Sequence, residues 1–182
     1  MTAPPLLRVR DLRVALPAGG DRTHAVDGIG FDLHAGEILC IVGESGSGKS
    51  LTASAIMGLL PRSVRVAGGT VELGGSDLLG LAEDEMRSRR GRLLGMIFQE
   101  PMTALNPLMR VGEQIDEVLA VHTDLPEAER RRRVVELMAQ VNLPDPEQLR
   151  LAFPFQLSGG QRQRVMIAMA LALGPSLLIA DE

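Results

Sequence analysis

One glycine-rich stretch of the chain has the residue types and spacing of a phosphate-binding loop. Its residues fit the pattern G-x-x-x-x-G-K-[ST] at every fixed position, in the order Gly43, Glu44, Ser45, Gly46, Ser47, Gly48, Lys49 and Ser50. Glycines let the backbone wrap around a phosphate with its N–H groups pointing inward, and a following helix N-terminus adds positive partial charge. Lys49 is suited to the terminal phosphates and the Ser50 hydroxyl to Mg²⁺. This stretch, the P-loop, predicts a nucleotide site rather than an empty glycine turn.

The basic residues of the chain point to the same site. Of the 19 basic residues 18 are arginines, and the single lysine is Lys49. A chain that otherwise uses arginine keeps a lysine where a compact ammonium on a flexible stem is needed. This supports the assignment of Lys49 to a phosphate.

The elements on either side of the P-loop fit its mechanism. Residues 37–42 form a short apolar run that predicts a buried parallel strand, in which Cys40 is expected to be a small buried residue. Residues 51–60 have the spacing of a helix, and Pro61 is expected to end it. Strand, loop and helix start thus follow in the required order.

Composition excludes several other classes of protein. Aromatic residues make up 2% of the 182 residues, the net charge is −4 and the pI is near 5.5, so the chain lacks the features of a general nucleic-acid binder. The single cysteine excludes a disulfide framework or a cysteine-rich metal site within this stretch. We find no signal peptide, and glycine and proline interrupt the longest apolar run, residues 165–180. We therefore expect a soluble intracellular chain whose membrane connection runs through a partner.

The N-terminal part predicts an antiparallel β-layer beside the P-loop strand. Residues 6–16 alternate like an edge strand, residues 23–33 resemble a second strand, and residues 64–73 are expected to form a further hairpin.

The rest of the chain predicts a helical insertion between further strands and helices. We expect a polar helix within 78–92, strands at 93–98 and 177–180, helices at 111–121 and 126–141, and a helix at 162–173. In the second helix of the insertion, Glu127 is spaced to pair with Arg131, and Glu129 with Arg133. The run Arg130–Arg133 is interpreted as a solvated helix face, with a docking patch as the alternative.

The chain ends on two carboxylates that follow an apolar strand. Asp181, at the carboxyl end of that strand, is suited to holding Mg²⁺, and Glu182 to orienting or deprotonating an attacking water. A simple strand-end turn is the alternative, but the upstream P-loop favours the functional interpretation.

A second candidate phosphate contact lies at residues 157–161, which we call the signature loop. Ser158 is a favourable N-cap, and Gly159 and Gly160 leave the following amides accessible at a helix N-terminus. Gln161 is the last residue of this loop. The P-loop is itself expected to enclose one triphosphate. The signature loop is therefore expected to serve the nucleotide of a second subunit.

These motifs together resemble those of ABC transporter ATPase subunits over essentially the whole chain. The P-loop, Gln99, the signature loop and residues 177–182 are similar in order and spacing to the Walker A, Q-loop, signature and Walker B motifs. The stretches 55–61, 96–107 and 153–164 further resemble the dipeptide, oligopeptide and nickel importer ATPases. The implied fold is an α/β P-loop NTPase core with an antiparallel β-layer and an inserted helical subdomain. The core would comprise residues 1–100 and 156–182, and the subdomain residues 101–155.

The resemblance also implies roles for residues and partners. Gln99 would touch Mg²⁺ and the attacking water, Lys49 and Glu182 would act in hydrolysis, and Ser50 and Asp181 would ligate Mg²⁺. The signature loop would close on the γ-phosphate of ATP held by a second ATPase subunit, identical or related, in a head-to-tail dimer. A membrane permease would dock near Gln99 and the helical subdomain at the cytoplasmic face of the membrane. An extracytoplasmic solute-binding protein would take part indirectly, and no nucleic acid is expected.

The chain departs from this family in several places. Residues 6–23 contain no aromatic residue to stack on adenine, so the stacking residue stays unassigned, with His24 or an apolar contact as the alternatives. Phe155 stands where histidine is frequent. The D-loop, the switch histidine and further strands are expected after Glu182. The full-length protein is therefore expected to bind and hydrolyse ATP and to energise an importer for peptides or similar small solutes, and the alternative is a truncated fragment that binds ATP without hydrolysing it. A non-transport ABC ATPase acting on DNA is less favoured, because the chain has no long coiled-coil insertion or zinc module.

Overall fold

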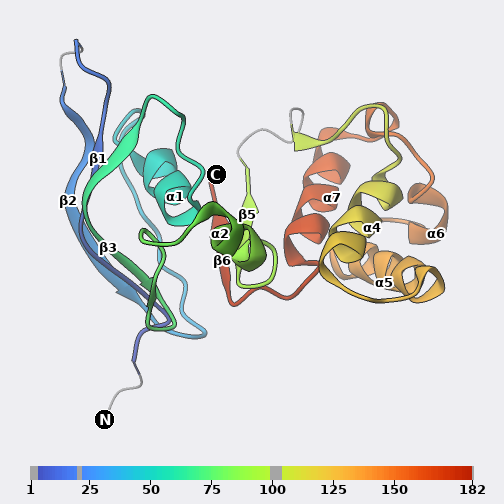
Figure 1. Cartoon of the computed structure of the whole chain (residues 1–182). Coiled ribbons are helices and arrows are strands. Elements are labelled where there is room, and N and C mark those ends of the chain that lie inside the picture. Colours follow the sequence, from blue (N-terminus) through green and yellow to red (C-terminus); the bar gives the residue numbers. More distant parts are fainter. Residues whose placement is uncertain (1–3, 20–21, 99–103, 182) are drawn as a thin grey trace. The chain divides into compact units, whose positions relative to one another are not determined.

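The computed structural model describes residues 4–19, 22–98 and 104–181, which form two compact units (Figure 1). The first unit comprises residues 1–89 together with Asp181, and the second comprises residues 90–180 together with Glu182. Gln99 and Glu182, two of the predicted site residues, lie outside the described residues.

The first unit is built on a four-stranded antiparallel sheet. Its strands are β1 (Leu7–Ala15), β2 (His24–Leu33), β3 (Arg65–Leu73) and β4 (Ser76–Asp77), in the order β2-β1-β3-β4. Leu7, Val9, Leu12 and Val14 of β1 are buried, as the alternation predicts. The sheet confirms the antiparallel β-layer. The predicted hairpin within residues 64–73 is wrong, because residues 65–73 form the single strand β3, which turns at Gly74 and Gly75 to pair with β4.

The predicted place of the first strand in the sheet is wrong. β1 lies between β2 and β3 rather than at an edge. Asp11 has a left-handed φ of 46°, and the pairing register shifts beside it on both sides of β1. Alternation reports that one face is buried, which is equally true of an inner strand, so it could not decide the position.

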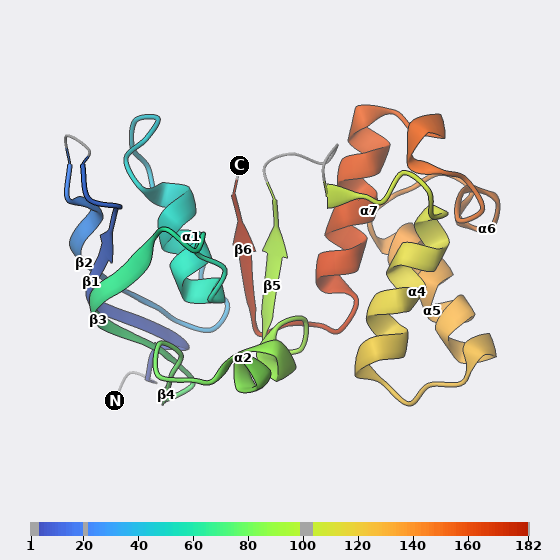
Figure 2. The same cartoon turned by 45° about the horizontal axis from the view of Figure 1, so that its top comes forward.

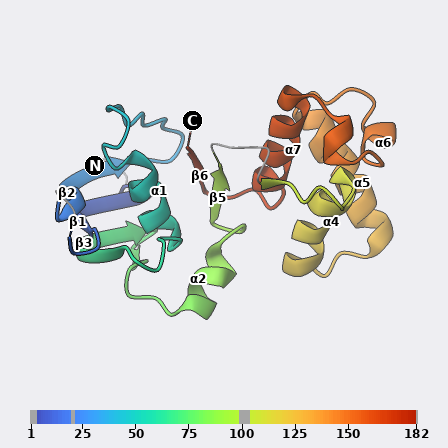
Figure 3. The same cartoon turned by 90° about the horizontal axis from the view of Figure 1, so that it is seen from above.

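Two helices complete the first unit. α1 (Lys49–Met57) lies against β1 and β2 (Figure 3), and α2 (Glu83–Arg89) follows β4. The helix after the P-loop is confirmed, but it ends three residues earlier than predicted. Gly58 adopts a left-handed conformation with φ 64° and caps α1 before Pro61 is reached.

The predicted buried strand before the P-loop is not formed. Neither of the two sheets of the described residues includes residues 37–42. Ile38 and Val42 are 90% and 93% exposed, and Cys40 is exposed rather than buried. A strand has no hydrogen bonds within itself, so an apolar run becomes a strand only where a neighbouring strand pairs with it. The apolar residue types at 37–42 show that burial would be favourable, but they do not show whether a neighbouring strand is present to pair with this segment.

The second unit contains a parallel strand pair and a group of helices. β5 (Leu94–Ile97) pairs in parallel with β6 (Leu177–Ala180), and their arrows lie side by side in Figure 2. The helices are α4 (Val111–His122), α5 (Glu127–Gln140), α6 (Pro146–Leu149), the 3-10 helix η1 (Pro154–Gln156) and α7 (Gly159–Leu171). The strands predicted at 93–98 and 177–180 are confirmed, and so are the two helices predicted within the insertion.

A single apolar cluster joins the long helices. Ile115 and Leu119 of α4, Leu137 of α5 and Val165 of α7 are at most 2% exposed and belong to it. Burying side chains of this size contributes about 1.5–3 kcal/mol each, so the cluster fixes the start of α7 relative to α4 and α5. In the part of the chain that the structure describes, no helix is long and apolar enough to span a membrane.

Candidate nucleotide-binding site

The P-loop runs directly into the N-terminus of α1 (Figure 2). Its turn is closed by a hydrogen bond from Ser47 N to Glu44 O (3.2 Å), and the Thr52 amide and hydroxyl both donate to Gly48 O (2.8 and 3.0 Å). The first amides of a helix have no partner within it, so those of α1 remain available to an anion. The local fold thus has the turn and the helix start on which the predicted phosphate cradle depends.

Among the glycines of the P-loop, Gly48 is the one that lies too close to the main chain of another element to carry a side chain. It caps α1 with φ 94°, and a Cβ at this position would lie 2.4 Å from Ala25 O and 3.0 Å from Val26 Cγ2 of β2. A side chain there would both strain the backbone and collide with the main chain of β2. Glycine allows the loop to pass β2 and enter the helix.

Gly48→Ala is expected to destabilise the chain by about 2 kcal/mol or more, because left-handed strain and a main-chain clash add. Gly46→Ala is the matched control. Gly46 also has a positive φ, 78°, but nothing lies within 4 Å of its Cβ position, so about 1–2 kcal/mol of strain is expected alone. Urea unfolding measures both. Equal losses would show that the approach to β2 is not what requires glycine at residue 48.

Lys49 lies over its own loop. Its Nζ donates to Gly43 O at 2.8 Å and to Glu44 O at 3.0 Å. These two bonds hold the ammonium at the loop rather than in open solvent. An ammonium has three donors and can exchange carbonyl oxygens for phosphate oxygens with little movement of its stem.

Ser50 and Asp181 are brought together from distant parts of the sequence. The Ser50 hydroxyl donates to Asp181 Oδ1 at 2.9 Å, across 131 positions of the chain. A hydroxyl and a carboxylate oxygen are hard ligands of the kind Mg²⁺ takes, and Mg²⁺ characteristically keeps several waters beside one or two protein ligands. The pair therefore fits Mg²⁺ on its chemistry. The other predicted metal ligand, Gln99, and the predicted base, Glu182, lie outside the described residues.

The signature loop begins α7 through a reciprocal cap. Ser158 N donates to Gln161 Oε1 (2.9 Å), and Gln161 N donates to Ser158 Oγ (3.3 Å). Ser158 is the N-cap, as predicted, and the helix begins at Gly159 rather than at residue 162. The two glycines thus lie in the first turn of the helix, with their amides at its positive end.

Gly159 and Gly160 are not required by the fold. Neither adopts a left-handed backbone, and nothing lies within 4 Å of a Cβ at either position. A glycine in a helix is less favourable than alanine by roughly 0.8–1.0 kcal/mol. The chain therefore keeps two residues that weaken α7 and that its own packing does not need.

Three side chains beside the signature loop form a stack that sequence reasoning missed. The rings of Phe153 and Phe155 stack at 5.7 Å between centroids and 9° between planes, and the Arg110 guanidinium lies 5.9 Å from the Phe153 centroid. The sequence could have indicated the two rings, because Phe153 and Phe155 stand on either side of Pro154. It could not have indicated Arg110, which meets Phe153 only through the tertiary fold.

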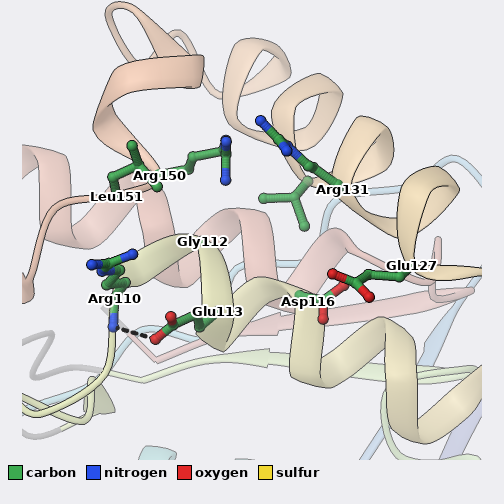
Figure 4. Close-up of a pocket in the computed structure, with 9 residues that line it drawn as sticks. Arg110, Gly112, Glu113, Asp116, Glu127, Arg131, Arg150 and Leu151 are labelled. Atoms are coloured by element: carbon green, nitrogen blue, oxygen red, sulfur yellow. Dashed lines mark hydrogen bonds between the residues drawn. The ribbon is translucent and has the colours of Figure 1, made fainter.

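The helices of the second unit also enclose a pocket of mixed charge (Figure 4). Its volume is about 170 Å³, and it is lined by Arg110, Gly112, Glu113, Asp116, Glu127, Arg131, Val134, Arg150 and Leu151. The guanidiniums of Arg131 and Arg150 point toward one another in Figure 4, and both lie near Glu147 Oε2, at 4.0 and 3.0 Å. Asp116 accepts from Arg130 at 2.8 Å, and this hydrogen bond raises the pKa of Arg130.

The ion pairs of α5 differ from the predicted ones. Arg131 pairs with Glu147 of α6, and Arg133 pairs with Glu136 at 3.3 Å. Arg131 and Arg132 are 62% and 71% exposed, as expected for a solvated helix face. Spacing within one helix could not show that α6 presents a competing carboxylate.

The comparisons agree with these motifs. The model of the ABC transporter family matches residues 26–182. A peptidoglycan transport ATP-binding protein, YejF of Agrobacterium fabrum, is 53% identical over 98% of this chain and 33% of its own length. An oligopeptide transport ATP-binding protein, OppD of Bacillus subtilis, is 50% identical over 97% of this chain and 50% of its own length. The chain thus spans about a third to a half of these curated relatives.

Solved structures give the same fold. The ATP-binding cassette MJ0796, a dimer in a post-hydrolysis state bound to ADP and Pi, has a TM-score of 0.83 and 29% identity, over 96% of this chain and 72% of its own. The protein cbiO1 of Clostridium perfringens, part of the ABC transporter complex cbiONQ, has a TM-score of 0.78 and 29% identity, over 99% of this chain and 66% of its own. With the P-loop, the signature loop and the Ser50–Asp181 pair in place, this chain belongs to the ABC transporter family.

Proposed function

We propose that the chain is the ATP-binding and ATP-hydrolysing subunit of an importer for oligopeptides or similar small solutes. The names of the relatives support the solute class, since they are oligopeptide and peptidoglycan transport ATP-binding proteins. The observation that carries the proposal is the pair of glycines in the signature loop, which the packing of the chain does not require and which a ligand close to the start of α7 would explain.

Within one subunit, the P-loop would hold the nucleotide. Its amides and Lys49 would bind the terminal phosphate oxygens, with the Lys49 ammonium leaving the Gly43 and Glu44 carbonyls for them. Ser50 and Asp181 would hold Mg²⁺, which when bound neutralises phosphate charge. Glu182 would orient the attacking water and accept its proton, and Gln99 would contact that water.

Between subunits, the signature loop would complete the site. Ser158, Gly159, Gly160 and Gln161 would close over the γ-phosphate held by a partner's P-loop in a head-to-tail dimer. The similar cassette is a dimer bound to ADP and Pi, which supports a dimeric assembly with nucleotide. Glycine at residues 159 and 160 would let the phosphate reach the amides that start α7.

Gly160→Asp is expected to leave the fold intact and abolish ATP-dependent dimerisation. An acid in the first turn favours a helix by about 0.3–1 kcal/mol, so unfolding free energy should be unchanged or slightly higher. The carboxylate would repel phosphate, and the ATP concentration for half-maximal dimerisation should rise on the order of 100-fold. Urea unfolding and sedimentation with ATP measure the two effects.

Ala128→Asp provides the control for this experiment. Ala128 is exposed and holds the same second position of α5 that Gly160 holds in α7. The control should keep normal dimerisation. Normal dimerisation of Gly160→Asp as well would contradict the role of the signature loop.

The partners of this subunit would be membrane proteins. We propose that a permease docks on the second unit at the cytoplasmic face of the membrane, with an extracytoplasmic solute-binding protein acting indirectly. The pocket in Figure 4 supports this, because the guanidiniums and carboxylates that line it suit a polar segment of another chain.

A further inference from the structure

The stack of Arg110, Phe153 and Phe155 includes one exposed ring. Phe153 contacts both other side chains, with the Arg110 guanidinium 5.9 Å from its centroid and the Phe155 ring stacked on it at 5.7 Å. Phe155, the outer member, is 69% exposed. The chain has four phenylalanines and no Trp or Tyr, and two of the four form this stack, in which Phe155 is exposed.

The stack is held firmly beside the signature loop. Phe153 N donates to Gln156 Oε1 (2.8 Å), and Gln156 N donates to Phe153 O (2.9 Å). Arg162 Nε, from the first turns of α7, donates to Pro154 O at 2.7 Å. Pro154 is buried and restricts the backbone between the two rings. The backbone that carries Phe155 is therefore held in place three residues before Ser158, and the Phe155 side chain itself stacks on Phe153.

An exposed, pre-oriented ring beside a phosphate-binding helix start suits the base of a nucleotide. Aromatic rings stack on a nucleobase with a gain of roughly 1–3 kcal/mol, and the base lies a ribose and a triphosphate away from the γ-phosphate. Phe155 lies in η1 and Ser158 caps α7, so the ring and the amides that start α7 are three residues apart along the chain and one ligand can meet both. On the P-loop side, residues 6–23 contain no Phe, Tyr or Trp for that base, and His24 is the alternative there.

We propose that Phe155 is the stacking surface for the adenine of the ATP held in the partner subunit's P-loop. This rests on the proposed head-to-tail dimer and assigns the base, as well as the γ-phosphate, to the signature side of the interface. Phe153 and Arg110 are positioning residues, because Phe153 stacks on the Phe155 ring and Arg110 contacts Phe153.

The test measures ATP-dependent dimerisation of Phe155→Ala. The ATP concentration for half-maximal dimerisation should rise roughly tenfold, and Phe155→Trp should restore it. Inorganic tripolyphosphate has no base, so any dimerisation that it supports should be the same in wild type and Phe155→Ala. Val121→Ala, which trims another exposed apolar side chain of the same unit, should behave as wild type.

Mixing variants shows on which subunit the ring acts. Phe155→Ala mixed with Lys49→Ala should form a site of normal ATP affinity, because the intact P-loop then faces an intact Phe155. The double variant Lys49→Ala/Phe155→Ala mixed with wild type should form the weakened site in its mixed dimers. The opposite pattern would place the ring in cis and overturn the proposal.

Other outcomes are separable. Equal losses with ATP and tripolyphosphate would make Phe155 a structural support of the signature loop, and loss of permease association without an ATP effect would make it a protein-docking residue. Both overturn the proposal. If ATP drives no dimerisation of wild type, the proposed head-to-tail dimer fails, and the stacking proposal falls with it.

Discussion

Replacing Lys49 with alanine is expected to lower ATP affinity on the order of 100-fold or more. Two charge-assisted hydrogen bonds to phosphate, each contributing about 1.5–3 kcal/mol, would be lost. The loop itself should lose little, because its carbonyls at Gly43 and Glu44 are exposed and return to water. Fluorescent-nucleotide titration measures the affinity, and urea unfolding checks the fold.

Two variants serve as controls for the Lys49 experiment. Lys49→Arg keeps the charge but brings a rigid planar fork to a site shaped for an ammonium, so it should recover little affinity. Arg62→Ala removes an exposed cation from the segment after α1 and should bind ATP normally. Normal ATP binding by Lys49→Ala would contradict the assignment of the P-loop.

Replacing Glu182 with glutamine is expected to stop hydrolysis while preserving ATP binding. Removing a general base lowers the chemical step about 10²–10⁴-fold, whereas the amide keeps the size of the carboxylate. Lys49, Ser50 and Asp181 remain in place, so the ATP-bound dimer should accumulate. In the assembled transporter, phosphate release gives the rate and sedimentation gives the dimer.

The neighbouring carboxylate separates the two acidic roles. Asp181→Asn should weaken Mg²⁺ dependence, because it alters the partner of the Ser50 hydroxyl. Glu182→Gln should leave Mg²⁺ dependence of ATP binding unchanged. A Glu182→Gln transporter that hydrolyses ATP at the normal rate would show that another group activates the water.

Local sequence determined the parts of the site that depend on local backbone. The P-loop and the Ser158 cap follow from residue types over eight and four positions, and the structure has the turns, helix starts and capping bonds these types favour. The apolar strand before Asp181 was predicted in the same way, from a short run with a glycine-proline stop before it.

Features that depend on distant partners were not predictable. The apolar residues 37–42 meet no pairing strand among the described residues and stay exposed, and β1 proved to be an inner strand. Arg131 found a carboxylate on α6 that helix spacing could not reveal. The contact of Arg110 with Phe153 likewise spans 43 positions and needs the tertiary fold.

The glycines show what structure adds to a motif. In the sequence, Gly48 and Gly160 are equally fixed members of phosphate-binding patterns. In the structure, a Cβ at residue 48 would lie 2.4 Å from Ala25 O, so this position requires glycine. A Cβ at residue 160 would meet nothing within 4 Å. The fold thus requires the first glycine but not the second, which we propose serves a ligand, and residue types alone do not make this distinction.

The central claim is that the P-loop of one subunit and the signature loop of another make one ATP site. Sedimentation of an equimolar mixture of Lys49→Ala and Gly160→Asp chains with ATP tests it most directly. Each variant alone should remain monomeric, whereas the mixture should form dimers, because one pairing joins an intact P-loop to an intact signature loop. A mixture that stays monomeric where wild type dimerises would contradict the shared site.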